Sequence, residues 1–293
     1  MAVKRVVLAA LWLAPTLAGC GQAAETPKSA PVTSTVTVTS SGASVPPATA
    51  EADETADWSG KMIPTYEDAT SPDAVVGRDL MRDDRLLEDL ADGINESLKL
   101  PHDVPLIGKQ CDEANAYWSI DDASMTICYE DAADALQIYT EQGDPDPVAS
   151  AINSEIATFY HETGHMAIDL YGLPITGREE DVADQLAAYV LLTPGEDGSI
   201  DPAAVQAVKD FAREFRGYSE RNGEIDEGQL ADVHSLDRAR MYNLECWVYG
   251  ADPVANADLV EDGSLPQDRA DGCQDEYEKL SDAWSSLLEP YFK

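Results

Sequence analysis

Basic residues are scarce in this chain. Its 293 residues include 19 Lys and Arg against 56 Asp and Glu, which gives a formal net charge of −37 at pH 7. Such a polyanion is repelled by nucleic-acid phosphates and by anionic lipid surfaces, so we expect no nucleic acid among its partners. Hydrophobic residues nevertheless make up 44% of the chain, enough to bury a sizeable core, which excludes a wholly disordered or fibrous protein.

Long hydrophobic runs are missing as well. The apolar stretch at residues 6–19 is too short to cross a bilayer comfortably, but it follows Lys4 and Arg5 as a signal-peptide core does. It ends in the sequence LAGC, which resembles a bacterial lipobox. We therefore expect residues 1–19 to be a lipoprotein signal peptide and Cys20 to be lipidated, anchoring the protein on the extracytoplasmic face of the cell membrane. The alternative is an ordinary secretory signal with a chance cysteine.

The segment that follows, residues 20–59, is rich in Thr, Ser, Pro and Ala. This composition is typical of a disordered tether. The remaining residues, 60–293, have the ordinary size of one globular domain.

CxxC pairs are absent, which disfavours a metal site built from four cysteines. Apart from Cys20, the chain has an even number of cysteines, and in an exported protein this favours disulfides. We expect Cys111 to pair with Cys128 across a hairpin, and Cys246 to pair with Cys273 between two helices, because each pair brackets a compact unit.

Apolar periodicity predicts an α+β fold that is mostly helical, with a small antiparallel sheet in the N-terminal half. One helix is expected over residues 73–98, before Pro101. The expected strands are 104–109, 116–120 and 124–129, the last two forming a hairpin. Further helices are expected over 130–142, 147–171, 178–192, 202–218, 236–249 and 274–288.

Histidine is also rare, yet two of the four histidines stand in the sequence HETGH, which fits the HExxH motif. His161 and His165 are expected to lie one above the other on a helix face, where two imidazoles can bind one Zn²⁺. Glu162 would lie beside the metal without binding it and could take a proton from metal-bound water. The alternative is a pair of surface histidines on a polar helix face.

A catalytic zinc site needs a third protein ligand and an open position for water. Because only two other histidines remain, we expect a carboxylate. Thr176 and Glu179 fit a capping box at the start of the next helix, which leaves Glu180 free to turn toward the metal. Glu180 is the expected ligand and Glu179 its rival. Asp184, four residues later on the same face, would accept the second ring N–H of a ligating histidine.

His234 lies near the expected start of another helix, in one stripe with Arg238 and Tyr242. A hydrogen-bond donor there could stabilise the oxyanion of a tetrahedral intermediate, which would give His234 a catalytic role. The alternative is a capping or packing residue.

The HExxH motif followed by EDVAD at residues 180–184 resembles the gluzincin type of zinc metallopeptidase. Further blocks resemble a bacterial family of candidate metallopeptidases: NAYW at 115–118, HETGHMAID at 161–169, GREEDVADQ at 177–185, HSLDRARMYNLECWVYG at 234–250 and LPQDRADGCQDEY at 265–277. The resemblance implies a zincin-like fold, with Glu162 as general base, Glu180 as third ligand and Asp184 orienting a histidine. The step from His165 to Glu180 is shorter than in the best-known gluzincins, which predicts a tight connection between two helices.

Together these features predict a membrane-anchored, extracytoplasmic zinc metallopeptidase acting on a peptide or protein substrate. Zn²⁺ would lower the pKa of its water to about 7, and Glu162 would carry the proton to the leaving amine. A strand of the early hairpin would align the substrate. The alternatives are a zinc-binding lipoprotein without turnover, and a metal-free adhesin or chaperone on a tether.

Overall fold

The computed structural model describes residues 58–293. The expected signal peptide at residues 1–19, the expected lipidation site Cys20 and nearly all of the expected tether at 20–59 lie outside the described residues. Within residues 58–293, no helix combines the length and the apolar character that crossing a bilayer would require.

The sheet has four strands, β1 (Met62–Tyr66), β2 (Val104–Lys109), β3 (Ala116–Ser119) and β4 (Ser124–Cys128), in the order β1-β2-β4-β3. The expected hairpin is present, since β3 and β4 pair antiparallel. The sheet as a whole is mixed rather than antiparallel, because β2 pairs parallel with both β1 and β4. Two helices join β1 to β2 and return the chain to the same end of the sheet, as a parallel pair requires.

The sequence did not predict β1. This strand is short and contains Pro64, which weakens a strand pattern. The structure places it at an edge of the sheet, where proline is tolerated because one side of the strand needs no ladder hydrogen bonds.

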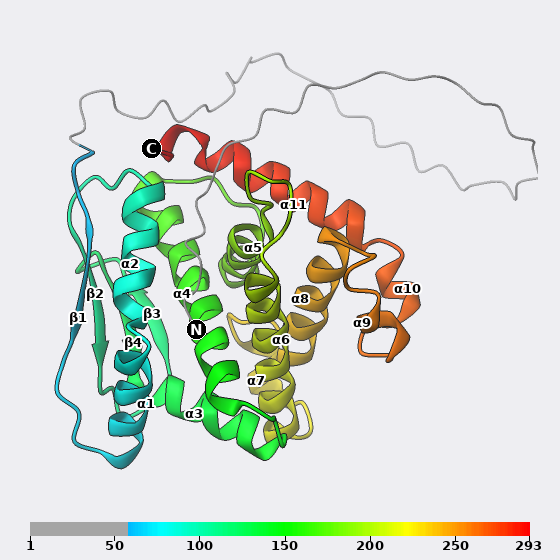
Figure 1. The fold of residues 1–293 in the computed structure, drawn as a ribbon, viewed down its shortest axis with the longest axis horizontal. Coiled ribbons are helices and arrows are strands. Elements are labelled where there is room, and N and C mark those ends of the chain that lie inside the picture. Colours follow the sequence, from blue (N-terminus) through cyan, green and yellow to red (C-terminus); the bar gives the residue numbers. More distant parts are fainter. Residues whose placement is uncertain (1–57) are drawn as a thin grey trace, which may run out of the picture.

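Helices make up most of the rest, so the predicted mostly helical α+β class is confirmed. In Figure 1 the sheet lies with α1 and α2 on one side of the long helix α4, and α5, α6, α8 and α11 lie on the other. The helices are α1 (Pro72–Asp83), α2 (Leu86–Ser97), α3 (Tyr129–Glu141), α4 (Pro147–Tyr171), α5 (Glu179–Leu192), α6 (Pro202–Asn222), α7 (Glu227–Ala231), α8 (Asp237–Ala251), α9 (Asp258–Glu261), α10 (Gln267–Ala270), α11 (Cys273–Leu288) and the 3₁₀ turn η1 (Glu289–Tyr291). The short helices α7, α9 and α10 were not predicted, since a single turn carries no apolar period.

The helix expected over residues 73–98 is in fact two helices. Arg85 has a left-handed backbone, with φ of 57°, and separates α1 from α2. The change of direction lets Met81 of α1 and Leu87 of α2 both become fully buried. The Leu87 backbone N–H donates to the Tyr66 hydroxyl, which secures the start of α2 against β1.

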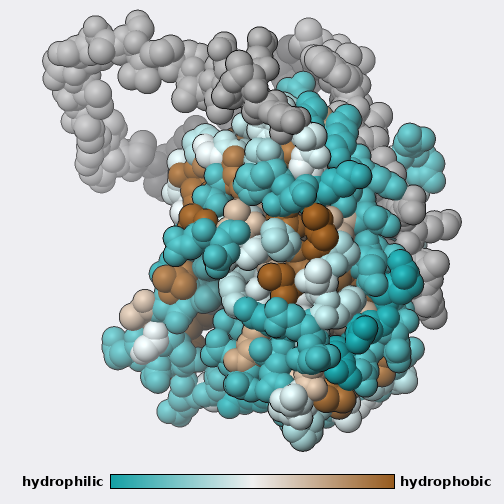
Figure 2. Space-filling model, turned by 90° about the vertical axis from the view of Figure 1, so that its left-hand side faces the viewer, coloured by the Kyte–Doolittle hydropathy of each residue, from teal (hydrophilic) through white to brown (hydrophobic). Residues whose placement is uncertain are grey.

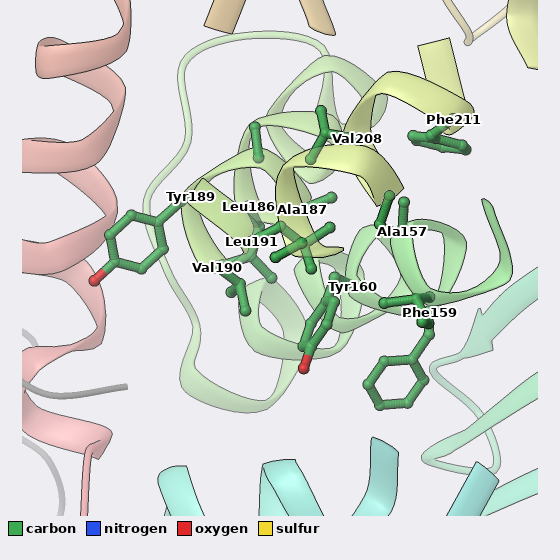
Figure 3. Close-up of a cluster of buried hydrophobic side chains, with 14 of the residues drawn as sticks. Ala157, Phe159, Tyr160, Leu186, Ala187, Tyr189, Val190, Leu191, Val208 and Phe211 are labelled. Carbon is green, nitrogen blue, oxygen red and sulfur yellow. The ribbon is translucent and has the colours of Figure 1, made fainter. Parts of the chain in front are cut away.

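Helix α4 runs through the centre of the molecule. It begins as predicted, with the Asp146 side chain accepting from the Ala149 N–H and Pro147 in the first turn, and it ends at Gly172 in a left-handed conformation. Its apolar face packs against α5 and α6, where Ala157, Leu186 and Phe211 are among the buried residues (Figure 3).

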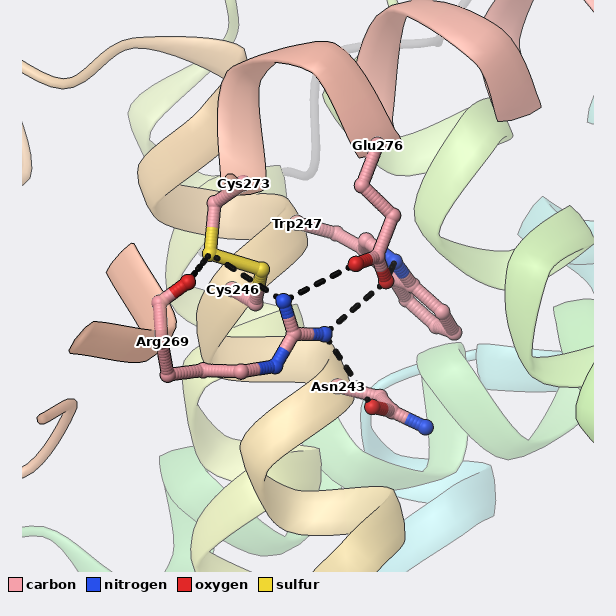
Figure 4. The surroundings of a disulfide bond; sticks show 6 residues. All are labelled: Asn243, Cys246, Trp247, Arg269, Cys273 and Glu276. Atoms are coloured by element: carbon pink, nitrogen blue, oxygen red, sulfur yellow. Dashed lines mark hydrogen bonds and ion pairs between the residues drawn. A yellow bond between two sulfur atoms is a disulfide. The ribbon is translucent and has the colours of Figure 1, made fainter. Parts of the chain in front are cut away.

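Both disulfides follow the expected pairing, Cys111 with Cys128 and Cys246 with Cys273. The second ties α8 to α11. Beside it the Arg269 guanidinium pairs with Glu276, whose carboxylate also accepts from the Trp247 indole N–H (Figure 4). All four cysteines of residues 58–293 are therefore used structurally, and none of them is left as a thiolate ligand.

The face of the molecule that carries the β1 edge is mostly hydrophilic, with apolar side chains in a few small areas (Figure 2). This surface agrees with the strongly acidic composition of the chain.

Candidate metal centre

Helix α4 carries both histidines of the HExxH motif, one turn apart. Their Nε2 atoms lie 3.3 Å from each other, and the His161 ring is almost fully buried. They therefore do not form the polar surface pair that was the alternative interpretation.

Helix α5 reaches these histidines because α4 has a glycine at the crossing point. A Cβ atom added to Gly164 would lie 2.7 Å from Ala183 Cα, closer than real side chains approach. The absence of a side chain at Gly164 thus lets the two backbones come together. As expected, the connection is tight: α4 ends at Tyr171 and α5 begins at Glu179.

Glu180, in the first turn of α5, faces both imidazoles. Its Oε2 atom lies 3.2 Å from His161 Nε2 and 3.3 Å from His165 Nε2. One ligand atom from each of the three residues can be chosen so that all lie within 4.8 Å of one another, the spacing of a metal-binding group.

Glu179 has a different position from the one expected. Arg178 is the N-cap of α5 and makes no side-chain capping bond, so Thr176 and Glu179 form no capping box. Instead Glu179 Oε1 accepts a hydrogen bond from His165 Nδ1 at 2.8 Å. It therefore lies behind the ring that Glu180 faces.

Asp184 is the corresponding carboxylate for the other histidine, since its Oδ1 accepts from His161 Nδ1 at 2.8 Å. With each Nδ1 acting as a donor, the neutral imidazoles turn the lone pairs of both Nε2 atoms toward Glu180 Oε2. The two Nε2 atoms and Glu180 Oε2 all present lone pairs, so at this spacing they need a positive charge between them. This donor set fits a divalent metal ion.

The electrostatics of the ligands point the same way. Burial lowers the pKa of His165, but hydrogen bonds to Glu180 and Glu179 outweigh burial and raise it to about 9. Burial raises the pKa of Glu180, yet its hydrogen bonds with His161 and His165 hold it well below the usual range. Positive charge and an ionised carboxylate are thus favoured at this place, and a metal ion held by the neutral imidazoles would supply that charge in place of a proton.

Arg240 in α8 completes the arrangement, and sequence reasoning missed it. Its Nε and Nη2 atoms donate to both oxygens of Asp184, at 2.8 and 2.7 Å, while its guanidinium stacks over the Phe215 ring. Although burial raises the pKa of Asp184, this guanidinium holds it below its usual range. The expected position of Asp184 behind a metal-binding histidine was the available signal, because a carboxylate buried there needs a cation such as Arg240 beside it.

Glu162 lies beside the three candidate ligands. Its side chain is buried, with Oε1 4.0 Å from His161 Nε2, and burial raises the pKa of the carboxyl above its ordinary value. A buried carboxylate with a raised pKa suits proton transfer near neutral pH.

His234 also reaches the centre, but from a loop. It precedes α8, so it does not share a helical stripe with Arg238 and Tyr242 as expected. Its Nε2 lies 3.3 Å from Glu180 Oε2, and its Nδ1 donates to Asp232 Oδ1 at 2.8 Å. It is half exposed, which leaves room for it to contact a ligand.

Two cavities adjoin the centre, of about 680 Å³ and about 530 Å³. The side chains of His161, Glu162 and His234 line both of them. The larger cavity also extends along β3, past Tyr117 and Trp118. The candidate metal centre is therefore open to a ligand on two sides.

Comparison with known proteins gives one match. The model of the DUF4344 family, described as "Putative metallopeptidase", matches residues 66–288, which span nearly the whole described part of the chain. Neither a curated protein nor a solved structure shows significant similarity to the chain. The chain belongs to this metallopeptidase family.

Proposed function

We propose that this protein is a zinc peptidase that hydrolyses peptide bonds, with His161, His165 and Glu180 as the metal ligands. The proposal rests on one observation: two imidazole nitrogens converge on Glu180 Oε2, beside a buried glutamate and two cavities. Two imidazoles and one carboxylate, with a position left open, are the donor set of catalytic zinc sites. Bound there, zinc would supply Lewis acidity to polarise a carbonyl group and to acidify water.

Glu162 is the proposed general base. Its carboxylate accepts a proton from the attacking water and then delivers it to the leaving nitrogen of the peptide. The support is its burial next to His161 and the rise in pKa that burial causes, since a higher pKa makes the carboxylate a stronger base.

His234 is proposed to donate a hydrogen bond to the peptide carbonyl oxygen as negative charge develops on it. Its Nδ1 is held by Asp232, which fixes the ring, and its Nε2 points toward the ligand Glu180. Two hydrogen bonds from Arg178 to the backbone carbonyls of Asp232 and His234, each of 3.3 Å, keep this loop close to α5.

Strand β3 is proposed to align the substrate. It is the edge strand of the sheet next to the larger cavity, so its outer side can pair with an extended peptide. The Trp118 indole N–H donates to Asp169 of α4 at 2.9 Å, which holds the strand against the helix that carries the histidines.

The location of the enzyme is also part of the proposal. Lipidation at Cys20 and a tether at residues 20–59 would hold the domain on the extracytoplasmic face of the membrane. The two disulfides support an oxidising compartment, since disulfides persist there.

The test compares Glu162→Gln with the wild type in zinc content and in peptide hydrolysis. We expect one zinc per chain in both proteins, and a loss of kcat of about 10²- to 10⁴-fold in the variant. His161→Ala should lose the zinc. A variant that cleaves as fast as the wild type would refute the role of Glu162, whereas a wild type that holds zinc but cleaves no peptide would favour the non-catalytic scaffold.

A further inference from the structure

The smaller of the two cavities beside the metal centre has an acidic interior. Asp131 of α3 and Glu214 of α6 line it, together with the aromatic side chains of Phe211 and Tyr218. We call this cavity of about 530 Å³ the acidic cavity. Since His161 and Glu162 line it too, anything bound there lies next to the reacting atoms.

Glu214 is the unusual residue in this wall. Its side chain is buried, with 3% of the residue exposed. Its Oε1 accepts from the Tyr218 hydroxyl at 3.1 Å, but its Oε2 has no hydrogen-bond partner within residues 58–293. A buried carboxylate oxygen without a partner is costly, and in a cavity wall a ligand can supply the missing donor.

No cation among residues 58–293 forms a salt bridge with this acid pair. The salt bridges of the described chain include neither Asp131 nor Glu214. Arg240 lines the same cavity, but its donors are directed at Asp184. The cavity therefore has two carboxyl groups and, among the described residues, no arginine or lysine free to pair with them.

The electrostatics agree with this geometry. Burial raises the pKa of Asp131 to about 7 and that of Glu214 to about 8. Both carboxyl groups also raise the pKa of the neighbouring Glu155. A positive charge placed between them would favour their ionised forms.

The shape of the cavity selects among cations. Phe211 and Tyr218 offer apolar surface leading to the carboxylates, which suits a side chain with an alkyl stem and a charged end. A small inorganic cation would leave this apolar surface uncovered.

We infer that the acidic cavity receives the side chain of a lysine or arginine that flanks the scissile bond, with Glu214 and Asp131 pairing with its charged end. This inference rests on the proposed peptidase function and specifies its substrate class.

The test uses pairs of peptides that differ in a single charge. A quenched-fluorescence peptide series places one arginine at each position in turn, and each member has a twin with citrulline, the neutral isostere. For one position next to the scissile bond, we expect wild-type kcat/KM to favour arginine by about 10- to 100-fold, as for hydrogen bonds to charged groups. Glu214→Gln and Asp131→Asn should reduce this preference, measured for each variant as the ratio of kcat/KM for the arginine peptide to kcat/KM for its citrulline twin.

Asp275→Asn is the matched control, because it also removes one negative charge but lies on the exposed surface of α11, away from the cavity. It should keep the full preference for arginine. Equal cleavage of both twins by the wild type, or a preference that survives Glu214→Gln and Asp131→Asn together, would overturn the inference.

A binding arm separates this inference from the proposed function. The same peptides are titrated into the full-length wild type and into Glu162→Gln, and binding is followed by fluorescence anisotropy. If no peptide is cleaved but arginine is bound more tightly than citrulline, and only when Glu214 and Asp131 are intact, the acidic cavity stands while the peptidase proposal fails.

Discussion

The neighbours of His161 give its two ring nitrogens different tasks. Nδ1 donates to Asp184, so Nε2 keeps its lone pair for the metal centre. Asp184 in turn stays ionised because Arg240 binds both of its oxygens. The orientation of one candidate ligand thus depends on a guanidinium that lies behind its ring, with Arg240 Nη2 3.4 Å from His161 Nδ1.

Replacing this guanidinium is the first prediction. Arg240→Ala would leave the Asp184 carboxylate buried without its cation, which costs about 3–5 kcal/mol of the free energy of unfolding. It should also weaken zinc binding by about 10- to 100-fold, since His161 loses its fixed orientation. Urea unfolding and competition with a chelator measure the two effects.

Arg238→Ala is the control for that experiment. Arg238 lies on the exposed side of α8, and its one side-chain hydrogen bond in the described part of the chain is a long one to the Tyr242 hydroxyl, at 3.5 Å. It should change neither quantity appreciably. If Arg240→Ala behaved like this control, the proposed chain from Arg240 through Asp184 to His161 would be wrong.

At this scale the sequence predicted the residues that lie within one helical turn of each other. Helical geometry alone puts His161 above His165 and Glu180 above Asp184. It could not predict Arg240, because 56 residues separate this side chain from Asp184 and only packing brings α8 against α5. The sequence also predicted a capping box for Glu179, whereas in the structure this side chain accepts a hydrogen bond from His165 instead.

Among the elements, the crossing of α4 and α5 decides the geometry of the centre. Glu180 and Asp184 reach the histidines only if the two helices approach closely, and that approach depends on Gly164 opposite Ala183.

The second prediction follows from this crossing. In Gly164→Ala the new methyl group meets the Ala183 backbone, so α5 must move away from α4. We expect a loss of about 1–3 kcal/mol in the free energy of unfolding, which is the usual cost of overpacking. Zinc affinity should fall with it, because Glu180 moves away from the imidazoles.

Gly93→Ala provides the comparison. Gly93 is also inside a helix, α2, but an added Cβ there would meet only the Tyr160 hydroxyl, at an ordinary 3.8 Å. This change should stabilise the protein by up to about 1 kcal/mol, since alanine is the better helix former. A Gly164→Ala protein that is as stable and binds zinc as tightly would show that the close approach is not required.

The elements themselves were predicted well where their pattern was long. Helix α4 was predicted over its observed range, because a capping aspartate, a first-turn proline and a terminal glycine mark its ends. The parallel pairings of β2 and the edge strand β1 were missed, since strand partners are chosen by the packing of distant segments and not by their own sequences.

In the whole molecule, the shortage of basic residues leaves some buried acids without a cation. Glu155 and Glu214 are almost fully buried, and each has one carboxylate oxygen that finds no hydrogen-bond partner among the described residues. Such groups favour the protonated form in the folded state, because burial penalises their charge.

Stability should therefore fall as pH rises through the neutral range, which is the third prediction. Burial raises the pKa of Glu214 from 4.5 to about 8, so between these values the folded protein binds more protons than the unfolded chain. The free energy of unfolding then decreases with increasing pH in this window. Below pH 4.5 the proton is bound in both states, and the slope from this group vanishes.

Glu214→Gln isolates the effect in urea unfolding at pH 5, 6.5 and 8. The variant should lose this part of the slope and gain on the wild type by more than about 1 kcal/mol across the window. Asp275→Asn, which alters an exposed acid, should follow the wild type. Parallel pH profiles for the wild type and Glu214→Gln would contradict the prediction.

The acidic composition, the disulfide pairing, the helix that carries HETGH and the mostly helical class all follow from the sequence alone, because they depend on charge counts and on residues close along the chain. Only the tertiary structure decided that Glu180 faces both imidazoles, that Arg240 backs Asp184, that His234 arrives from a loop and that Asp131 and Glu214 line one cavity. These contacts join segments far apart in the chain. Their formation depends on how the helices pack, and a spacing within one segment holds no information about that packing.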